Sequence, residues 1–159
     1  MACGVVINMG RVFNTWSEVE EVLDAFNAFM RSWARPEPGL EDYGDVAIFS
    51  IARGKVVIRM NWGMRDGKYV LERFGVEFSD EYCMGGHCRG VFTINRDYDA
   101  GKRGLIARGL ARLASTIEDS GGTTKYVIGE LVISLGWVGE TLGSVSFEAG
   151  CLAPGTTRG

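Results

Sequence analysis

The sequence predicts an α+β fold in which a mainly antiparallel sheet carries two helices packed on one face. Two segments repeat apolar residues at three- and four-residue steps, as amphipathic helices do, and several shorter segments have the apolar or alternating pattern of strands. Short glycine-containing turns separate neighbouring strands. Such turns join antiparallel strands, whereas parallel strands need long crossovers. The predicted order of elements is β-α-β-β-β-β-α-β-β.

The first strand and the first helix are the clearest elements near the N-terminus. The apolar run Val5–Met9 predicts a strand. Thr15 and Glu18 have the spacing of a capping box, which begins a helix. A wide apolar stripe then consists of Trp16, Val19, Val22, Leu23, Phe26, Phe29, Met30 and Trp33. Pro36 and Pro38 end the helix. We expect the stripe to lie across a sheet; use as a partner surface is the alternative.

Residues 46–78 have the pattern of an antiparallel meander. The predicted strands are Val46–Ala52, Lys55–Trp62 and Tyr69–Phe78. Arg53-Gly54 and Asp66-Gly67 supply the two turns between them. The middle strand alternates apolar side chains with mostly polar ones, so we expect one face of this sheet to meet the core and the other to meet water.

The second half of the chain repeats the strand–helix–strand outline of the first half. Residues 79–89 predict a loop, and Asp99 can cap a second helix over about residues 100–119, which Ser120-Gly121-Gly122 ends. The predicted strands of this half are Gly90–Asn95, Lys125–Leu135 and Leu142–Glu148. Because the strand at 125–135 is apolar on both faces, we expect it to be central or covered on both sides.

Length and composition predict one α+β domain over residues 1–148, followed by a glycine-rich C-terminal tail over residues 149–159. The sequence has no apolar run long enough to span a bilayer and no signal-peptide pattern at its start, so we expect a cytoplasmic protein without membrane association. Thirteen arginines against four lysines, with no glutamine, suggest a thermophile or its virus, and a GC-rich genome explains the arginine equally well.

The charge distribution predicts a dipolar surface. The net charge is −3, which argues against a general nucleic-acid binder. Residues 51–112 carry twelve basic and seven acidic side chains, whereas the segments on either side are acidic. A basic middle between acidic ends could face a partner, and plain coverage of the outer faces of helices and strands is the alternative.

The loop around Cys83, His87 and Cys88 is the strongest candidate for chemistry. It holds two of the four cysteines and the single histidine, and with Cys3 or Cys151 it could supply four soft ligands to zinc. The C-x4-C spacing, with histidine directly before the second cysteine, departs from common zinc motifs. A Cys83–Cys88 disulfide and a pair of reduced thiols therefore remain open as alternatives.

Basic residues on the predicted polar sheet face form a second candidate site. Basic side chains interleaved with an aromatic ring on a sheet are a recurring arrangement for binding single-stranded nucleic acid. The candidates for contact with nucleic acid or a protein partner are Arg53, Lys55, Arg59, Tyr69 and Arg73 on the sheet, with Arg108 and Arg112 on the second helix.

The sequence contains neither the nucleotide-binding glycine loops nor the nucleophile elbow of α/β hydrolases. Without a catalytic set, the leading hypothesis is a non-enzymatic protein that binds another protein or assembles with itself as a homo-oligomer, without a cofactor. The alternatives are a small metal- or thiol-dependent protein centred on the Cys83–Cys88 loop and a protein that binds single-stranded nucleic acid through the basic sheet face.

Overall fold

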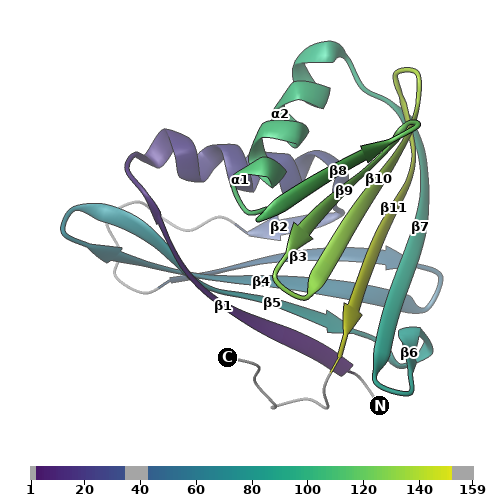
Figure 1. Cartoon of the computed structure of the whole chain (residues 1–159), viewed down its shortest axis with the longest axis horizontal. Helices are drawn as coiled ribbons and strands as arrows, with labels where there is room; N and C mark the ends of the chain where they lie inside the picture. Colours follow the sequence, from purple (N-terminus) through teal and green to yellow (C-terminus); the bar gives the residue numbers. More distant parts are fainter. Residues whose placement is uncertain (1–2, 35–42, 152–159) are drawn as a thin grey trace.

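The part of the chain that the structure describes folds into two antiparallel sheets and two helices (Figure 1). The computed structural model describes residues 3–34 and 43–151. Sheet 1 has the strand order β1 (Cys3–Phe13), β5 (Lys68–Phe78), β4 (Gly54–Arg65), β3 (Tyr43–Ile51) and β2 (Ser32–Ala34). Sheet 2 has the order β6 (Cys83–Met84), β7 (His87–Asp97), β11 (Thr141–Gly150), β10 (Leu131–Val138), β9 (Thr123–Ile128) and β8 (Thr116–Ser120). The α+β class and its antiparallel character are confirmed, but the predicted single sheet is in fact two.

The two halves of the chain have the same topology. We call residues 3–78 half 1 and residues 87–150 half 2. In each half, one strand leads into a helix, and four antiparallel strands then return to pair with the first strand. The helices are α1 (Trp16–Phe29) and α2 (Ala100–Ala111), and both leading strands are 11 residues long. The strand–helix–strand outline seen in the sequence therefore reflects a repeated architecture.

Equivalent residues cap the two helices. The Thr15 side chain accepts a hydrogen bond from the Glu18 amide at 3.3 Å, and the Asp99 side chain accepts one from the Lys102 amide at 2.8 Å. Each cap satisfies one of the backbone N–H groups left free in a first helical turn. Both capping residues were predicted from the sequence.

The helices cross in close contact at equivalent positions. Ala25 and Gly109, the tenth residue of α1 and α2 respectively, face each other. A Cβ atom at Gly109 would overlap both the Ala25 side chain and the Glu21 carbonyl oxygen, so glycine permits the close approach. Glu21 also accepts a hydrogen bond from Arg112 Nε at 2.7 Å and lies 3.5 Å from Arg108 Nε. The contact thus joins half 1 to half 2.

The first helix is shorter than predicted. It ends at Phe29, and Trp33 lies in the short strand β2 instead of continuing the apolar helical stripe. The reason is tertiary: Trp33 pairs with Ala47 in sheet 1 and stacks on Phe26, with ring centroids 5.8 Å apart. Its spacing from Phe26 fits a helix equally well, so periodicity alone could not distinguish the two. Pro36 and Pro38, predicted as helix stops, lie outside the described residues.

Two predicted elements of the second half are wrong in their bounds. Helix α2 ends at Ala111 rather than near residue 119, because residues 116–120 form β8. Gly121 and Gly122, with φ of 53° and 89°, turn the chain into β9 instead of ending a helix. The single strand predicted at 125–135 is two strands, since Gly129, with φ of 57°, and Glu130 form a hairpin turn between β9 and β10.

Aromatic side chains join the two sheets in a common core. Phe49 of sheet 1 lies against Phe92 and Phe147 of sheet 2, with ring centroids 4.2 and 5.9 Å apart. Strand β11 continues through Gly150, and Cys151 is buried, so the ordered fold extends into the predicted tail. None of the described helices has both the length and the apolar character needed to cross a membrane.

Candidate metal centre

Four cysteines from distant parts of the sequence meet at one end of the molecule. Cys3 begins β1, Cys83 begins β6, Cys88 lies in β7, and Cys151 follows β11. Figure 1 shows the start of β1, the β6–β7 hairpin and the end of β11 together at the lower end of the molecule, away from the helices. We call these four residues the cysteine cluster. They tie the beginning, middle and end of the described chain to one another.

The segment Cys83-Met84-Gly85-Gly86-His87-Cys88 is a tight β-hairpin, not the irregular loop expected from the sequence. Gly85 and Gly86 have φ of 58° and 82°, the left-handed conformations that a two-residue hairpin turn requires. The turn places Cys83 directly opposite Cys88. The Cys151 amide donates a hydrogen bond to the Gly86 carbonyl at 2.9 Å, which brings the fourth cysteine to the same hairpin.

The sulfur atoms form a shared cluster rather than isolated pairs. Cys3 Sγ contacts the sulfur atoms of both Cys83 and Cys88, and Cys88 Sγ also contacts Cys151 Sγ. A sulfur in a disulfide bonds one other sulfur, so these three contacts cannot all be covalent. The Cys83 and Cys88 sulfur atoms, the disulfide pair suggested by the sequence, lie 3.9 Å apart, well beyond the bond length of about 2.05 Å.

Backbone geometry allows two chemical states of this cluster. The Cα–Cα distances are 6.2 Å for Cys3–Cys83 and 5.8 Å for Cys88–Cys151, within the usual disulfide range of about 4.4–6.8 Å. The Cys3–Cys88 distance of 7.3 Å lies outside it. Two disulfides with the first two pairings are therefore possible. Cys3, Cys88 and Cys151 also lie close enough together to hold a metal ion.

His87 does not join the cluster. Successive side chains of a strand point to opposite faces, so Cys88 is buried whereas the adjacent His87 is exposed. His87 Nε2 lies 3.4 Å from Glu148 Oε2 on the neighbouring strand, and Arg89 Nε lies 3.5 Å from the same oxygen. The structure thus brings Cys83 and Cys88 together with Cys3 and Cys151, and it separates the predicted histidine ligand from them.

The surroundings of the cluster are largely apolar. Cys88 and Cys151 are buried, and Cys3 and Cys83 are partly buried. Tyr82, next to Cys83, packs edge-on against Phe92. Burial raises the pKa of the Tyr82 phenol, and the Glu81 charge raises it further, so the hydroxyl stays neutral.

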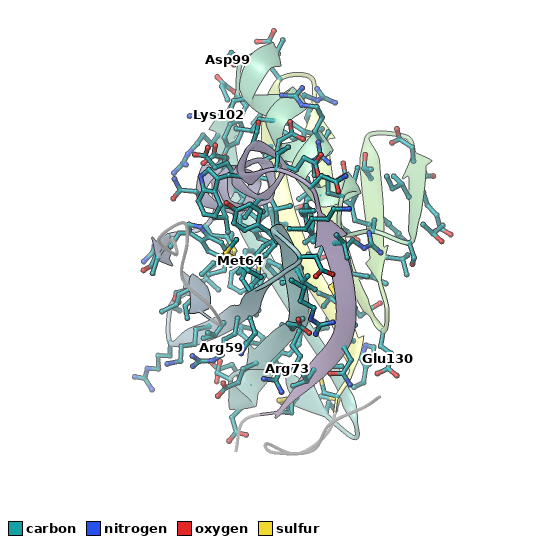
Figure 2. All side chains as sticks on the ribbon, turned by 90° about the vertical axis from the view of Figure 1, so that its left-hand side faces the viewer. Arg59, Met64, Arg73, Asp99, Lys102 and Glu130 are labelled. Atoms are coloured by element: carbon teal, nitrogen blue, oxygen red, sulfur yellow. A yellow bond between two sulfur atoms is a disulfide. The ribbon has the colours of Figure 1, made fainter. Side chains whose placement is uncertain are left out.

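The predicted basic sheet face is divided by the fold. Arg59 and Arg73 lie on neighbouring strands of sheet 1, on the face turned away from the core, and Figure 2 shows both toward the lower part of the molecule. Arg59 Nε is 3.8 Å from Glu77 Oε2. Tyr69 lies on the opposite face, where its ring is 5.4 Å from the Trp16 ring of α1. The stacking residue is therefore separated from the arginines.

Of the remaining predicted contact residues, Lys55 shares the outer face of β4 with Arg59, and the others lie elsewhere. Arg53 is in the exposed β3–β4 turn, and the exposed Lys55 begins the polar alternation of β4. Arg108 and Arg112 both interact with Glu21 across the helix contact. No protein-family model and no curated protein sequence matches this chain, so its function has to be inferred from the geometry.

Proposed function

We propose that this protein is a non-catalytic zinc-binding protein in which Cys3, Cys83, Cys88 and Cys151 hold one zinc ion as thiolates. The observation that carries the proposal is the sharing of sulfur contacts: Cys3 and Cys88 each approach two other cysteines. A metal ion accounts for such sharing because it binds four sulfur atoms at once, whereas disulfides divide them into separate pairs.

The spacing of the hairpin cysteines supports a tetrahedral ion. With Zn–S distances of about 2.3 Å, the sulfur atoms around zinc lie about 3.8 Å apart. Cys83 Sγ and Cys88 Sγ, on paired strands, have this spacing at 3.9 Å. The contacts of Cys3 with Cys83 and Cys88 and of Cys88 with Cys151 are closer and would have to widen around an ion. Thiolate ligands favour zinc or iron over the hard cations magnesium and calcium.

A structural role follows from the ligand count and from the position of the cluster. Cys3, Cys88 and Cys151 lie close enough to hold one ion, and Cys83, which contacts Cys3, would be the fourth ligand. Four protein ligands would leave no open coordination position for water or substrate, which is the arrangement of structural rather than catalytic zinc sites. Cys3 belongs to half 1 and Cys88 to half 2, so the ion would fasten the halves together. In Figure 1 the helix contact, which also joins them, lies at the other end of the molecule.

Metal and thiol content of the untagged protein test the proposal. We expect about one zinc ion per chain by plasma mass spectrometry, and four thiols that react with a thiol reagent after denaturation without reductant. Substitution with Co²⁺ should give the intense thiolate-to-metal absorption of a tetrathiolate site. Cys88→Ser should abolish stoichiometric metal, whereas His87→Ala, one residue away, should retain it.

A metal-free protein with no reactive thiols would overturn the zinc proposal. Peptide mapping would then be expected to find the Cys3–Cys83 and Cys88–Cys151 disulfides, which the Cα distances permit. Iron with sulfide in place of zinc would also overturn it. Self-assembly and single-stranded nucleic-acid binding stay predictions. For nucleic-acid binding, Arg59 and Arg73 lie on one face of sheet 1 and Tyr69 lies on the other.

A further inference from the structure

A small cavity of about 210 Å³ lies at the seam between the two halves, apart from the cysteine cluster. The end of α1 and strand β3 line it from half 1, and strand β7 lines it from half 2. Seams between packed units are common places for ligand sites because two surfaces meet there without filling the space. This cavity is smaller than a typical drug-sized site, so it suits a ligand of about ten non-hydrogen atoms.

The exposed Ile51 and the half-buried Ile94 form the accessible apolar side of the cavity, and phenylalanine rings lie behind them. Phe29, Phe49 and Phe92 are all buried, with ring centroids 6.5 Å apart for the first pair and 4.2 Å apart for the second. Because these rings pack against one another, they support a preformed cavity. An apolar ligand body placed here would displace water without disturbing the core.

Arginines form the charged part of the rim. Arg31 follows α1, and Arg96 lies near the end of β7. No carboxylate is among the residues that line the cavity in the described ranges, 3–34 and 43–151. Among the carboxylates whose side chains the structure describes, none lies within 4 Å of either guanidinium. This differs from Arg59, Arg108 and Arg112, each of which lies within 4 Å of a glutamate.

We infer that this cavity binds a small amphipathic anion, an organic carboxylate or phosphate monoester with a compact apolar body. The body lies against Ile51 and Ile94, which cover the phenylalanine rings, and the anionic head lies at the rim between Arg31 and Arg96. Guanidinium groups pair with carboxylate and phosphate oxygens through parallel N–H donors, so both head groups share the same recognition chemistry. Ser50 and Thr93 also line the cavity.

The test is a titration of the full chain, as purified, with four aromatic probes followed by amide NMR shifts and calorimetry. Benzoate and phenyl phosphate carry the two head groups, and benzamide and benzyl alcohol are their neutral counterparts. We expect saturable binding of at least one anion, with shifts centred on residues 49–51 and 92–96, and at least tenfold weaker binding of the neutral probes. Preference for benzoate or for phenyl phosphate identifies the head group.

Matched variants show which charges matter. Arg31→Gln and Arg96→Gln should each weaken anion binding at least tenfold, whereas Arg59→Gln and Arg73→Gln, which change arginines on the outer face of sheet 1, should leave it unchanged. All four side chains are exposed, so the variants are expected to fold, and circular dichroism checks this. Equal binding of charged and neutral probes, equal binding in Arg31→Gln, Arg96→Gln and the unmodified protein, or no saturable binding at millimolar concentration would overturn the inference.

Discussion

Half 1 and half 2 share one topology but pack their helices differently. Helix α1 presents Val19, Phe26 and Phe29 to the core of half 1, all buried. In α2, the position equivalent to Val19 is Arg103, an exposed arginine whose guanidinium lies 4.4 Å from the Trp137 ring centre. The same topology therefore has large aromatic side chains on the helix of half 1 and smaller or polar side chains on the helix of half 2.

The consequence of this difference is an open groove in half 2. Trp33 and Ile117 are each the second residue of the strand that follows the helix segment, β2 and β8. Trp33 packs on Phe26, whereas Ile117 remains 48% exposed and lines a groove of about 420 Å³ between α2 and sheet 2. Because α2 leaves this groove open, we expect half 2 to depend more on its connections to half 1, which are the cysteine cluster, the helix contact and the aromatic core shared by the two sheets.

The largest effect is expected from breaking the cysteine cluster. Cys88→Ala should lower the free energy of unfolding by on the order of 3–5 kcal/mol, since the change removes a buried member of a site that fastens the halves. His87→Ala, at the exposed neighbouring position, should cost less than about 0.5 kcal/mol. Urea unfolding followed by fluorescence measures both. A small, equal cost for the two variants would mean that the cluster does not hold the halves together.

The helix contact comes next. Gly109→Val should destabilise the protein by about 2–4 kcal/mol, because the new side chain would meet the backbone and side chain of α1 at Glu21 and Ala25. Gly104→Ala is the matched control on the same helix. Its Cβ would meet the terminal nitrogen of the Arg108 side chain at 3.1 Å, and this flexible group can move.

Gly104→Ala should therefore be neutral or stabilising by up to about 1 kcal/mol, through the higher helix propensity of alanine. Thermal unfolding of both variants, with circular dichroism at room temperature to confirm folding, gives the comparison. If both substitutions changed stability equally, close approach of the helix backbones would not be the reason for glycine at position 109. The helix contact at Ala25 and Gly109 would then not require a small residue.

The aromatic filling of half 1 can be tested at equivalent positions. Trp33→Ala should cost about 2 kcal/mol because the stacking on Phe26 is lost, whereas Ile117→Ala should cost about 0.5 kcal/mol or less. The Trp33 indole N–H has no hydrogen-bond partner among the described residues, so Trp33→Phe should be tolerated. A cost for Ile117→Ala as large as for Trp33→Ala would contradict the proposed difference between the halves.

Local sequence patterns predicted the fold class and the first residues of both helices. The last residues of the helices depend instead on strand pairing between residues distant in sequence. The caps at Thr15 and Asp99 depend on residues three apart, so they are readable from the sequence. Trp33 and Ile117 satisfy helical spacing as well as strand pairing, and the choice is made by partners distant in sequence, Ala47 and Tyr126. Periodicity contains no information about those partners.

The cysteine site was predicted only in part for a related reason. Cys83 and Cys88 lie close in sequence, so a site that contains both could be predicted, whereas Cys3 and Cys151 reach them through strand pairings. The signal against His87 was nevertheless present: adjacent residues in a strand face opposite ways. Strand alternation excludes His87 from the cysteine site only if residues 83–88 form a hairpin. The local evidence for that hairpin is Gly85-Gly86, a pair typical of two-residue turns.

The smallest expected effect concerns Tyr126, which faces the half 2 groove. Burial raises the pKa of its phenol, Asp119 raises it further, and Arg103 opposes the shift. The folded protein therefore keeps this proton at a pH where the unfolded chain has begun to lose it, above about pH 10. Stability that is fully present below that pH should be lost as the pH rises through the folded-state pKa.

Tyr126→Phe removes the ionisable group and should make the decline in stability above about pH 10 shallower than in the unmodified protein. Urea unfolding at a series of alkaline pH values measures the decline, and tyrosinate absorbance locates the titration. Parallel curves for the two proteins would show that the phenol is not shielded from water. Water would then reach the phenol of Tyr126 at the bottom of the half 2 groove. The helix of half 2 would thus be less well packed than that of half 1 at buried as well as exposed positions.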